Sequence, residues 1–262
     1  MEVWSRREFL ERACLVVAAH AGLQAFAFAP ESMQKPVEFQ RVRLHTARLP
    51  ELEQFYSKTL GLPVTKTESG LEVRAGSSIL EFGGVAAGSE PFYHFAFNIP
   101  ENKLEVAMEW LRPRCAIFKN PNTGQEIYHF VNWNAHSCYF HDPAGNILEF
   151  IARHTLPNAA PGGFSTRDIL SVSEIALVAP DLGPVAGRLK KGLDISDYPG
   201  TSPEFMPVGN EYGLFILVRS GRIWLGGTSQ ATVYPVEVLL HCDHPVQLRW
   251  EGLPYLVKSS AS

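Results

Sequence analysis

The sequence predicts an α+β fold made of tandem β-α-β-β-β units, and three observations predict it. Alternating apolar segments, which are typical of half-buried strands, begin near residues 39 and 93. Each is followed by apolar residues at helical spacing and then by several short strand candidates. The same order begins a third time near residue 172. Repetition of one supersecondary unit along a chain is a strong architectural signal.

The first unit is predicted over residues 39–82. Residues 39–45 alternate between apolar and polar side chains and predict a strand. Leucines and Tyr56 recur at helical spacing over residues 49–60, and Gly61 is a typical helix stop. Three short strand candidates follow, over residues 63–67, 71–74 and 77–82.

The second unit is predicted over residues 93–151. Its first strand alternates between phenylalanines on one face and His94, Ala96 and Asn98 on the other. A helix is expected to end at Pro113, and strand candidates lie around residues 117 and 127–133. The unit closes with a β-hairpin over residues 137–151, whose turn is D-P-A-G-N at residues 142–146.

A third, degenerate unit is predicted after a linker. Its first strand leads into a helix ending near Leu193, and residues 236–242 resemble the start of a fourth unit that too few residues remain to complete. Strand candidates follow the helix over residues 204–208, 214–219 and 222–225. We therefore expect paired units over residues 38–155 and a region over residues 168–262 with the third unit and a truncated fourth.

The first 29 residues resemble a bacterial twin-arginine export signal. Arg6 and Arg7 are followed by Phe9, Leu10 and a weakly apolar run. We expect residues 1–29 to be a signal peptide and the protein to be periplasmic or otherwise extracytoplasmic. No stable membrane association is expected after the signal is removed. An amphipathic helix or an uncleaved anchor is the alternative.

Composition is that of an ordinary globular protein. Of the 262 residues, 45% are hydrophobic and 19% are charged, and the formal net charge is −4. This balance gives no electrostatic basis for binding nucleic acid or an anionic membrane surface. The four cysteines are scattered, with no C-x-x-C pair, so neither a zinc knuckle nor a disulfide framework is expected.

Glu149 is the residue of the hairpin that most needs an explanation. It lies in the apolar run I-L-E-F-I at residues 147–151. A carboxylate in such surroundings is costly to bury unless it is paired or bound to a cation. Glu149 is therefore expected to face either a metal ion or an arginine, with Arg41 and Arg43 as the candidate partners.

Several segments resemble the vicinal oxygen chelate superfamily, which includes glyoxalase I, extradiol dioxygenases and bleomycin-binding proteins. The matching motifs are F-Y-x-K-x-L-G-L from residue 55, H-F-A-F from residue 94 and Y-F-x-D-P-A-G-N-x-x-E-F from residue 139. The resemblance is good over residues 38–153 and weak over residues 170–228. It implies strongly curved mixed sheets with helices on the outside, and a cup, shared by the first two units, that binds a ligand.

The resemblance also implies a metal site made of His94, Glu149 and Glu81. One imidazole and two carboxylates suit Zn, Mn, Fe or Ni and leave positions open for a substrate. Glu149 would also move a proton as the catalytic residue. The superfamily's first ligand position falls on Arg41, whose guanidinium cannot bind a metal. Arg41 can instead pair with Glu81 and take the place of a cation.

Other polar residues are candidates for substrate binding. Arg41, Arg43 and His45 share the polar face of the first strand and suit an anionic or polar small molecule. Ser137 and Tyr139 share a face of the hairpin and resemble positions that contact substrate in the superfamily.

The remaining candidates are assigned smaller roles. His136 is a further possible metal donor, whereas His129, His141 and His154 are interpreted as turn or surface residues. Glu174 falls at the first-ligand position of the third unit. Because no residue matching His94 or Glu149 follows it, that unit is interpreted as a structural partner.

Two classes of function are consistent with these residues. The first is a metal-dependent lyase, isomerase or dioxygenase acting on a small oxygen-rich molecule. The second is a metal-free protein of the same fold that sequesters a small molecule, because the fold alone does not imply catalysis. A subunit of a larger assembly is a third reading, and a homodimer is left open.

Overall fold

The structure is a computed structural model that describes residues 37–86, 88–224 and 229–260. The predicted signal peptide lies outside these residues. The first unit consists of β1 (Glu38–Thr46), α2 (Leu49–Gln54), β2 (Val64–Thr67), β3 (Gly70–Ala75) and β4 (Ser78–Gly84). Its helix continues as a π-helical turn over Phe55–Thr59 and is followed by Gly61. The φ of +69° at Gly61 is a left-handed value that glycine adopts readily, which explains the predicted stop.

The second unit consists of β5 (His94–Ile99), α3 (Leu104–Leu111), β6 (Tyr128–Phe130), β7 (Ala135–His141) and β8 (Ile147–Arg153). The β7–β8 turn has the predicted chemistry. Asp142 Oδ1 accepts hydrogen bonds from the backbone N–H groups of Ala144 (2.9 Å) and Asn146 (3.1 Å). The strand expected near residue 117 is reduced to a single bridge between Ile117 and Phe140.

The third unit consists of β9 (Ser171–Ala179), α4 (Leu182–Leu193), β10 (Phe205–Asn210) and β11 (Gly213–Arg219). The strand expected over residues 222–225 is an isolated bridge between Ile223 and Gln230. Three further strands follow: β12 (Val236–His241), β13 (Gln247–Trp250) and β14 (Leu253–Ser260).

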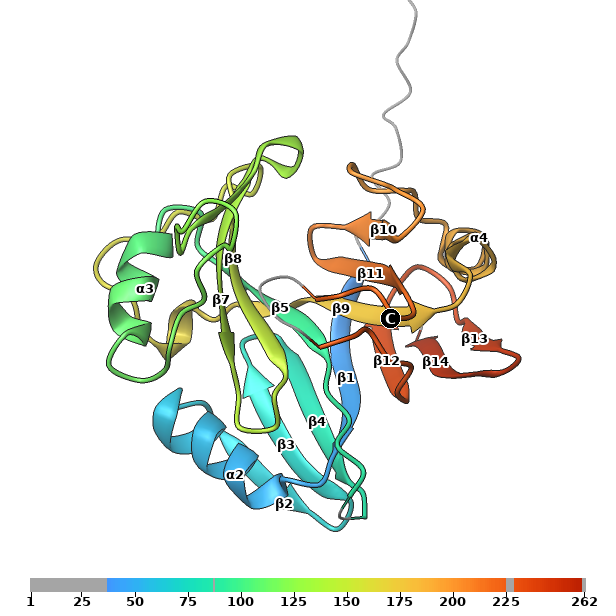
Figure 1. Cartoon of the computed structure of the whole chain (residues 1–262), viewed down its shortest axis with the longest axis horizontal. Coiled ribbons are helices and arrows are strands. Elements are labelled where there is room, and N and C mark those ends of the chain that lie inside the picture. The colour runs from blue at the N-terminus through green and yellow to red at the C-terminus, as the bar shows by residue number, and fades with distance from the viewer. Residues whose placement is uncertain (1–36, 87, 225–228, 261–262) are drawn as a thin grey trace, which may run out of the picture. The chain divides into compact units, whose positions relative to one another are not determined.

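These strands form two mixed seven-stranded sheets, so the predicted α+β class is confirmed (Figure 1). Sheet A has the order β13-β14-β12-β1-β4-β3-β2, and sheet B has the order β10-β11-β9-β5-β8-β7-β6. β1 is antiparallel to β12 and parallel to β4, and β5 is antiparallel to β9 and parallel to β8. In each sheet, two groups of strands therefore meet where their first strands pair. These pairs are β1 with β12 in sheet A and β5 with β9 in sheet B.

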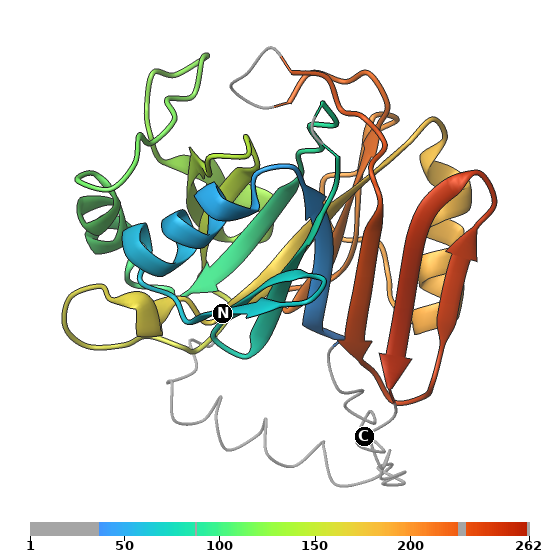
Figure 2. The same ribbon diagram turned by 90° about the horizontal axis from the view of Figure 1, so that it is seen from below.

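This order corrects the expectation that the first two units share one surface. The strands of the first unit lie in sheet A, and those of the second lie in sheet B. Figure 2 shows β12 and β14 beside β1, where they complete sheet A. The polar face of the first unit therefore belongs to a different sheet from the polar face of the second.

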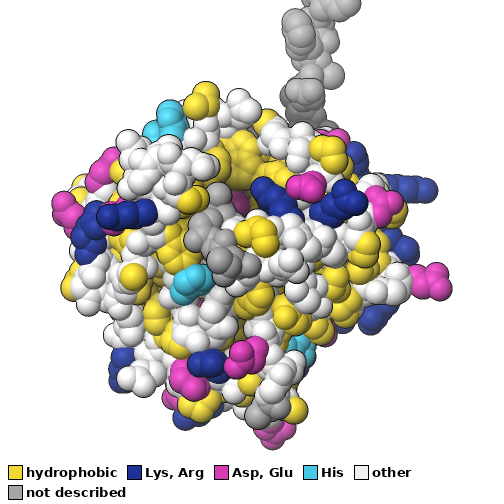
Figure 3. Space-filling view, viewed as in Figure 1, with side chains coloured by type: hydrophobic (Ala, Val, Ile, Leu, Met, Phe, Trp, Pro, Cys, Tyr) yellow, Lys and Arg dark blue, Asp and Glu magenta, His cyan; other side chains and the backbone are white. Residues whose placement is uncertain are grey.

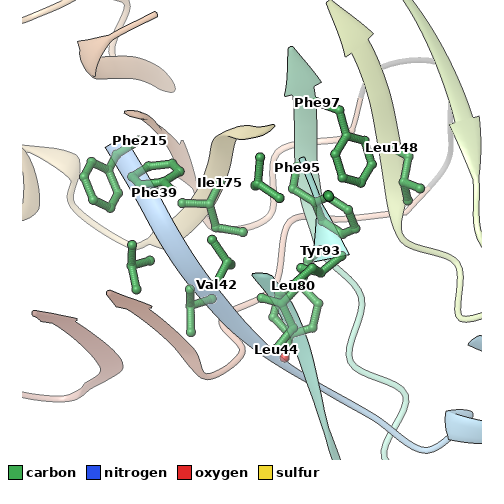
Figure 4. Close-up of a cluster of buried hydrophobic side chains, with 14 of the residues drawn as sticks. Phe39, Val42, Leu44, Leu80, Tyr93, Phe95, Phe97, Leu148, Ile175 and Phe215 are labelled. Carbon is green, nitrogen blue, oxygen red and sulfur yellow. The ribbon is translucent and has the colours of Figure 1, made fainter. Parts of the chain in front are cut away.

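The hydrophobic core fixes which face of each strand is buried (Figure 4). Phe39, Val42 and Leu44 of β1 pack in one cluster with Phe95 of β5 and Ile175 of β9. Buried leucines of α2, α3 and α4 join the same cluster. Because side chains alternate along a strand, the opposite face of β1 carries Arg41 and Arg43. The opposite face of sheet B carries a second buried cluster that includes Tyr139 and Trp224. No helix among the described residues is long and apolar enough to cross a membrane.

Candidate metal centre

Strand register brings one histidine and two glutamates together on the polar face of sheet B. Glu149 of β8 and Glu174 of β9 are the cross-strand partners of Ala96 on its two sides. His94 lies two residues before Ala96 on β5 and therefore on the same face. The methyl group of Ala96 is small, which leaves space between the two carboxylates.

The three side chains form a compact, buried donor set. His94 Nε2 lies 3.6 Å from Glu149 Oε2 and 4.0 Å from Glu174 Oε2. One potential ligand atom from each residue lies within 4.8 Å of the other two. His94 is 7% exposed and each glutamate is 1% exposed. Among the described residues this is the one group of three or more such side chains at that spacing.

The orientation of His94 leaves one ring nitrogen free to bind a cation. Nδ1 lies 3.1 Å from the carbonyl oxygen of Ile147, and a carbonyl can only accept a hydrogen bond, so Nδ1 carries the proton. Burial lowers the pKa of His94 to about 4, which keeps the ring neutral near pH 7. Nε2 then presents a lone pair toward two carboxylates. A histidine held by a carbonyl on its other nitrogen is the usual arrangement of a metal ligand.

The two carboxylates carry more negative charge than their surroundings neutralise. Burial raises the pKa of both, and the charge of Glu174 raises the pKa of Glu149 further. Arg153, which is fully buried, forms an ion pair with Glu174 Oε1 and donates from Nε to Asn98 Oδ1 (3.2 Å). Glu149 Oε1 has no hydrogen-bond partner among the described residues. With one arginine against two glutamates, the second carboxyl is either held neutral by a proton, as its raised pKa favours, or balanced by a bound cation.

The donor set opens into a cavity of about 220 Å³ with mainly aromatic walls. Its lining includes Phe130, Trp133, Tyr139, Phe205 and Trp224, together with the three donor residues. Arg222 supplies a positive charge to the lining. Figure 3 shows hydrophobic side chains gathered in a hollow of this face, with basic side chains beside it. The cavity combines apolar surface with a few polar groups, as small-molecule sites do.

Glu81 does not join this set, which corrects the expected ligand group. It lies on β4 of sheet A, where its Oε2 is 2.8 Å from an Arg41 nitrogen and its Oε1 is 3.3 Å from Arg43 Nε. Arg41 also forms an ion pair with Glu72 on β3. The alternative in which Arg41 pairs with Glu81 is therefore the arrangement in the structure. Both oxygens of Glu81 already face guanidinium groups.

The residues expected to bind substrate are divided between the two sheets. Arg41, Arg43 and His45 lie on β1 in sheet A, and burial together with the charge of Arg43 lowers the pKa of His45. Ser137 and Tyr139 lie on β7 in sheet B. Tyr139 lines the cavity, whereas Ser137 is completely buried. The hairpin candidates are thus close to the donor set, and the β1 candidates belong to the other sheet.

Sequence reasoning missed the role of Glu174 and did not single out Arg153 or Trp224. A signal for Glu174 was present, because it lies among Val172, Ile175 and Ala176 as Glu149 lies among apolar neighbours. It was interpreted as structural because a complete ligand set was sought within one unit. The structure shows that the set is shared by β5 and β8 of the second unit and β9 of the third.

Comparison with known proteins supports the fold. No protein-family model and no curated protein sequence matches the chain. A dioxygenase-like protein from Bacillus subtilis aligns with a TM-score of 0.56 and 14% identity over 86% of each chain. Glyoxalase I from Zea mays aligns with a TM-score of 0.52 and 13% identity over 86% of this chain and 92% of that one. The chain therefore shares the fold of these dioxygenase-like and glyoxalase I structures.

Proposed function

We propose that this protein is a metal-dependent enzyme of the vicinal oxygen chelate type, acting on a small oxygen-bearing molecule. The observation that supports this most strongly is the buried set of His94, Glu149 and Glu174, in which a neutral imidazole lone pair faces two carboxylates. One arginine balances only one of the two buried carboxyls, so the second must be held neutral by a proton or balanced by a bound cation, and the imidazole lone pair beside it favours the cation.

The donor chemistry fits a divalent ion of the Zn, Mn, Fe or Ni type. One nitrogen and two carboxylate oxygens are a mixed donor set that these metals accept, and three protein ligands leave coordination positions for substrate and water. When bound, the metal would supply a Lewis acid that polarises a substrate oxygen. The remaining steps depend on the side chains around it.

Glu149 is the residue we assign to proton transfer. Its Oε2 faces His94, while its Oε1 is free of hydrogen bonds to the described residues. One oxygen can therefore serve the donor set while the other accepts a proton from a molecule in the cavity.

Arg153 positions Glu174, and the cavity walls surround the His94 ring and the space for a substrate. Arg153 holds Glu174 Oε1 from behind and leaves Oε2 directed at His94. Tyr139 and Trp224 flank the His94 ring, with ring centroids 6.0 Å and 5.8 Å away. Walls of this kind favour a flat, partly apolar substrate, and Arg222 favours one that carries a negative charge.

Turnover by metal-loaded protein tests this proposal. The wild type would be loaded separately with Zn, Mn, Fe(II) and Ni and assayed with catechols by oxygen uptake and with α-hydroxycarbonyl compounds by absorbance. We expect turnover with one metal, its loss in Glu149→Gln, and its retention in the matched control Glu72→Gln from sheet A. A wild type that binds these compounds equally well with and without metal, and converts none, would favour the metal-free binding protein instead.

We also propose that the protein is exported. The support is the Arg6-Arg7 pair followed by an apolar run. Replacing both arginines with lysine should leave the protein in the cytoplasm with its N-terminus intact. Unchanged secretion of the double variant would refute export by this route.

A further inference from the structure

Three histidines gather on the face of sheet B opposite the metal centre. His136 Nδ1 lies 2.7 Å from His154 Nε2. The rings of His129 and His136 stack with centroids 4.2 Å apart and an interplanar angle of 10°. We call His129, His136 and His154 the histidine cluster. It uses none of the residues of the metal centre.

Strand register explains both the gathering and its separation from the centre. His129 of β6 is the cross-strand partner of His136 on β7, and His154 follows directly after β8. The sequence neighbours of the cluster, Tyr128 and Arg153, point toward the cavity side of the sheet. Because successive side chains alternate, the three histidines project from the other face.

Acidic groups accompany the cluster and orient it. Glu101 Oε2 lies 3.9 Å from His154 Nδ1, the ring nitrogen that does not face His136. The other ring nitrogen of His154, Nε2, faces His136. The carboxylate of Glu105 on α3 also acts electrostatically on His136. The side chains of His154 and Glu101 are 32% and 26% exposed, so the group is accessible to ions in solution.

We propose that His136 and His154 form a second, surface site for Cu²⁺, Ni²⁺ or Zn²⁺. The observed separation of the two nitrogens, 2.7 Å, is close to that of adjacent ligands. Two nitrogens at roughly 2.0–2.1 Å from one ion and at a right angle to each other are about 2.9 Å apart. An ion would displace the proton that the two rings share and would lie to one side of the line between the nitrogens, so each ring would rotate to direct its lone pair at the ion.

His129 supports this site without binding the ion. Its ring is nearly parallel to that of His136, with the two centroids 4.2 Å apart, so its lone pairs lie in a different plane from those of His136. The stack holds the His136 ring in place. With two imidazoles and water as ligands, the site should prefer Cu²⁺ over Ni²⁺ and Zn²⁺, following the general order of stability of such complexes.

Metal titration of tag-free full-length protein tests the site independently of the proposed function. Cu²⁺ would be titrated by calorimetry into wild type, His136→Ala, His154→Ala and His129→Phe, with His241→Ala on β12 as the matched control. We expect His136→Ala and His154→Ala to weaken one binding event by about 10-fold or more, as expected when a ligand is removed from a chelate. His129→Phe, which retains a stacking ring, and His241→Ala should keep it.

Electron paramagnetic resonance identifies the ligands directly. In a His94→Ala background, where the inner donor set has lost its nitrogen, bound Cu²⁺ should show coupling to two nitrogens. That coupling should fall to one nitrogen in His94→Ala/His154→Ala. Binding with no change in nitrogen coupling on loss of His154, or equal affinity in all variants, would overturn the second site. Failure of the inner site would leave this result unchanged, because the two sites share no residue.

Discussion

Each sheet carries a pair of glutamates on one face, and the two sheets neutralise these pairs differently. In sheet A, Glu72 and Glu81 are opposite each other on β3 and β4, and two arginines of β1 pair with them. In sheet B, Glu149 and Glu174 flank β5, and they meet one arginine and a neutral histidine. Charge is balanced by side chains in sheet A. In sheet B, the one arginine balances one of the two glutamates, because the His94 ring is neutral.

Burial makes this difference consequential. The side chains of Glu72 and Glu81 are 32% and 10% exposed, whereas those of Glu149 and Glu174 are each 1% exposed. Water can therefore solvate part of the charge on Glu72 and Glu81 in sheet A, but very little of any charge on Glu149 and Glu174 in sheet B. The comparison teaches that two arginines of β1 balance the paired glutamates of sheet A, whereas the glutamates of sheet B depend on one arginine and on either a proton or a bound cation.

Breaking the Arg153–Glu174 pair should have the largest effect on stability. Arg153→Met leaves Glu174 buried without its partner, and a broken buried pair costs roughly 3–5 kcal/mol. Urea unfolding of metal-free protein should report this loss in the free energy of unfolding. The double variant Arg153→Met/Glu174→Gln should recover most of it. A single variant within about 1 kcal/mol of wild type would show that the pair is solvated.

Removing metal should make stability fall as pH rises, because of Glu149. In metal-free protein its pKa is raised well above 4.5 by burial and by Glu174, so the folded state keeps a proton that the unfolded state has lost. The free energy of unfolding then falls with rising pH, by up to about 1.4 kcal/mol per pH unit, until the raised pKa is reached.

The window for this measurement is pH 6.5 to 8. Below pH 6.5, the lowered pKa of His94, about 4, removes stability as pH falls and opposes the Glu149 effect. Urea midpoints of chelator-treated wild type should fall more steeply over this window than those of Glu149→Gln. Parallel curves for the two proteins would contradict the buried, unpaired carboxyl.

Removing Arg41 should have the smallest effect. Arg43 remains beside Glu81, and Arg41 itself is 31% exposed, so Arg41→Met should cost no more than about 1 kcal/mol by thermal or urea unfolding. The metal content of sheet B should be unchanged, because Arg41 lies in sheet A. Loss of metal in Arg41→Met would show that metal binding depends on sheet A, which contradicts the assignment of the two glutamate pairs to independent sites.

Local patterns in the sequence predicted much of the fold and two of the three donors. Alternation placed His94 on the polar face of β5, and apolar neighbours marked Glu149 as a buried charge. The turn at Asp142 followed from residue types whose conformational preferences are local. Each of these features depends on neighbours within a few residues.

The pairing of units could not be predicted in the same way. Whether β5 pairs with β9 or with β1 is decided by core packing between distant segments such as Phe95 and Ile175. That choice brought Glu174 to the centre and left Glu81 in sheet A. The buried position of Arg153 has the same origin, because its partners Asn98 and Glu174 lie on other strands.

The metal content of two matched glutamate variants tests the central claim most directly. The background protein would be His136→Ala/His154→Ala, which lacks the surface site, and Glu149→Gln and Glu81→Gln would each be added to it. All three proteins would be dialysed against Zn, Mn, Fe(II) and Ni, freed of excess ion and measured by elemental analysis. We expect one ion per chain in the background protein and in Glu81→Gln, and a loss of about 10-fold or more in affinity in Glu149→Gln. A background protein that stays metal-free, or a loss in Glu81→Gln equal to that in Glu149→Gln, would contradict the assignment of the metal centre to sheet B.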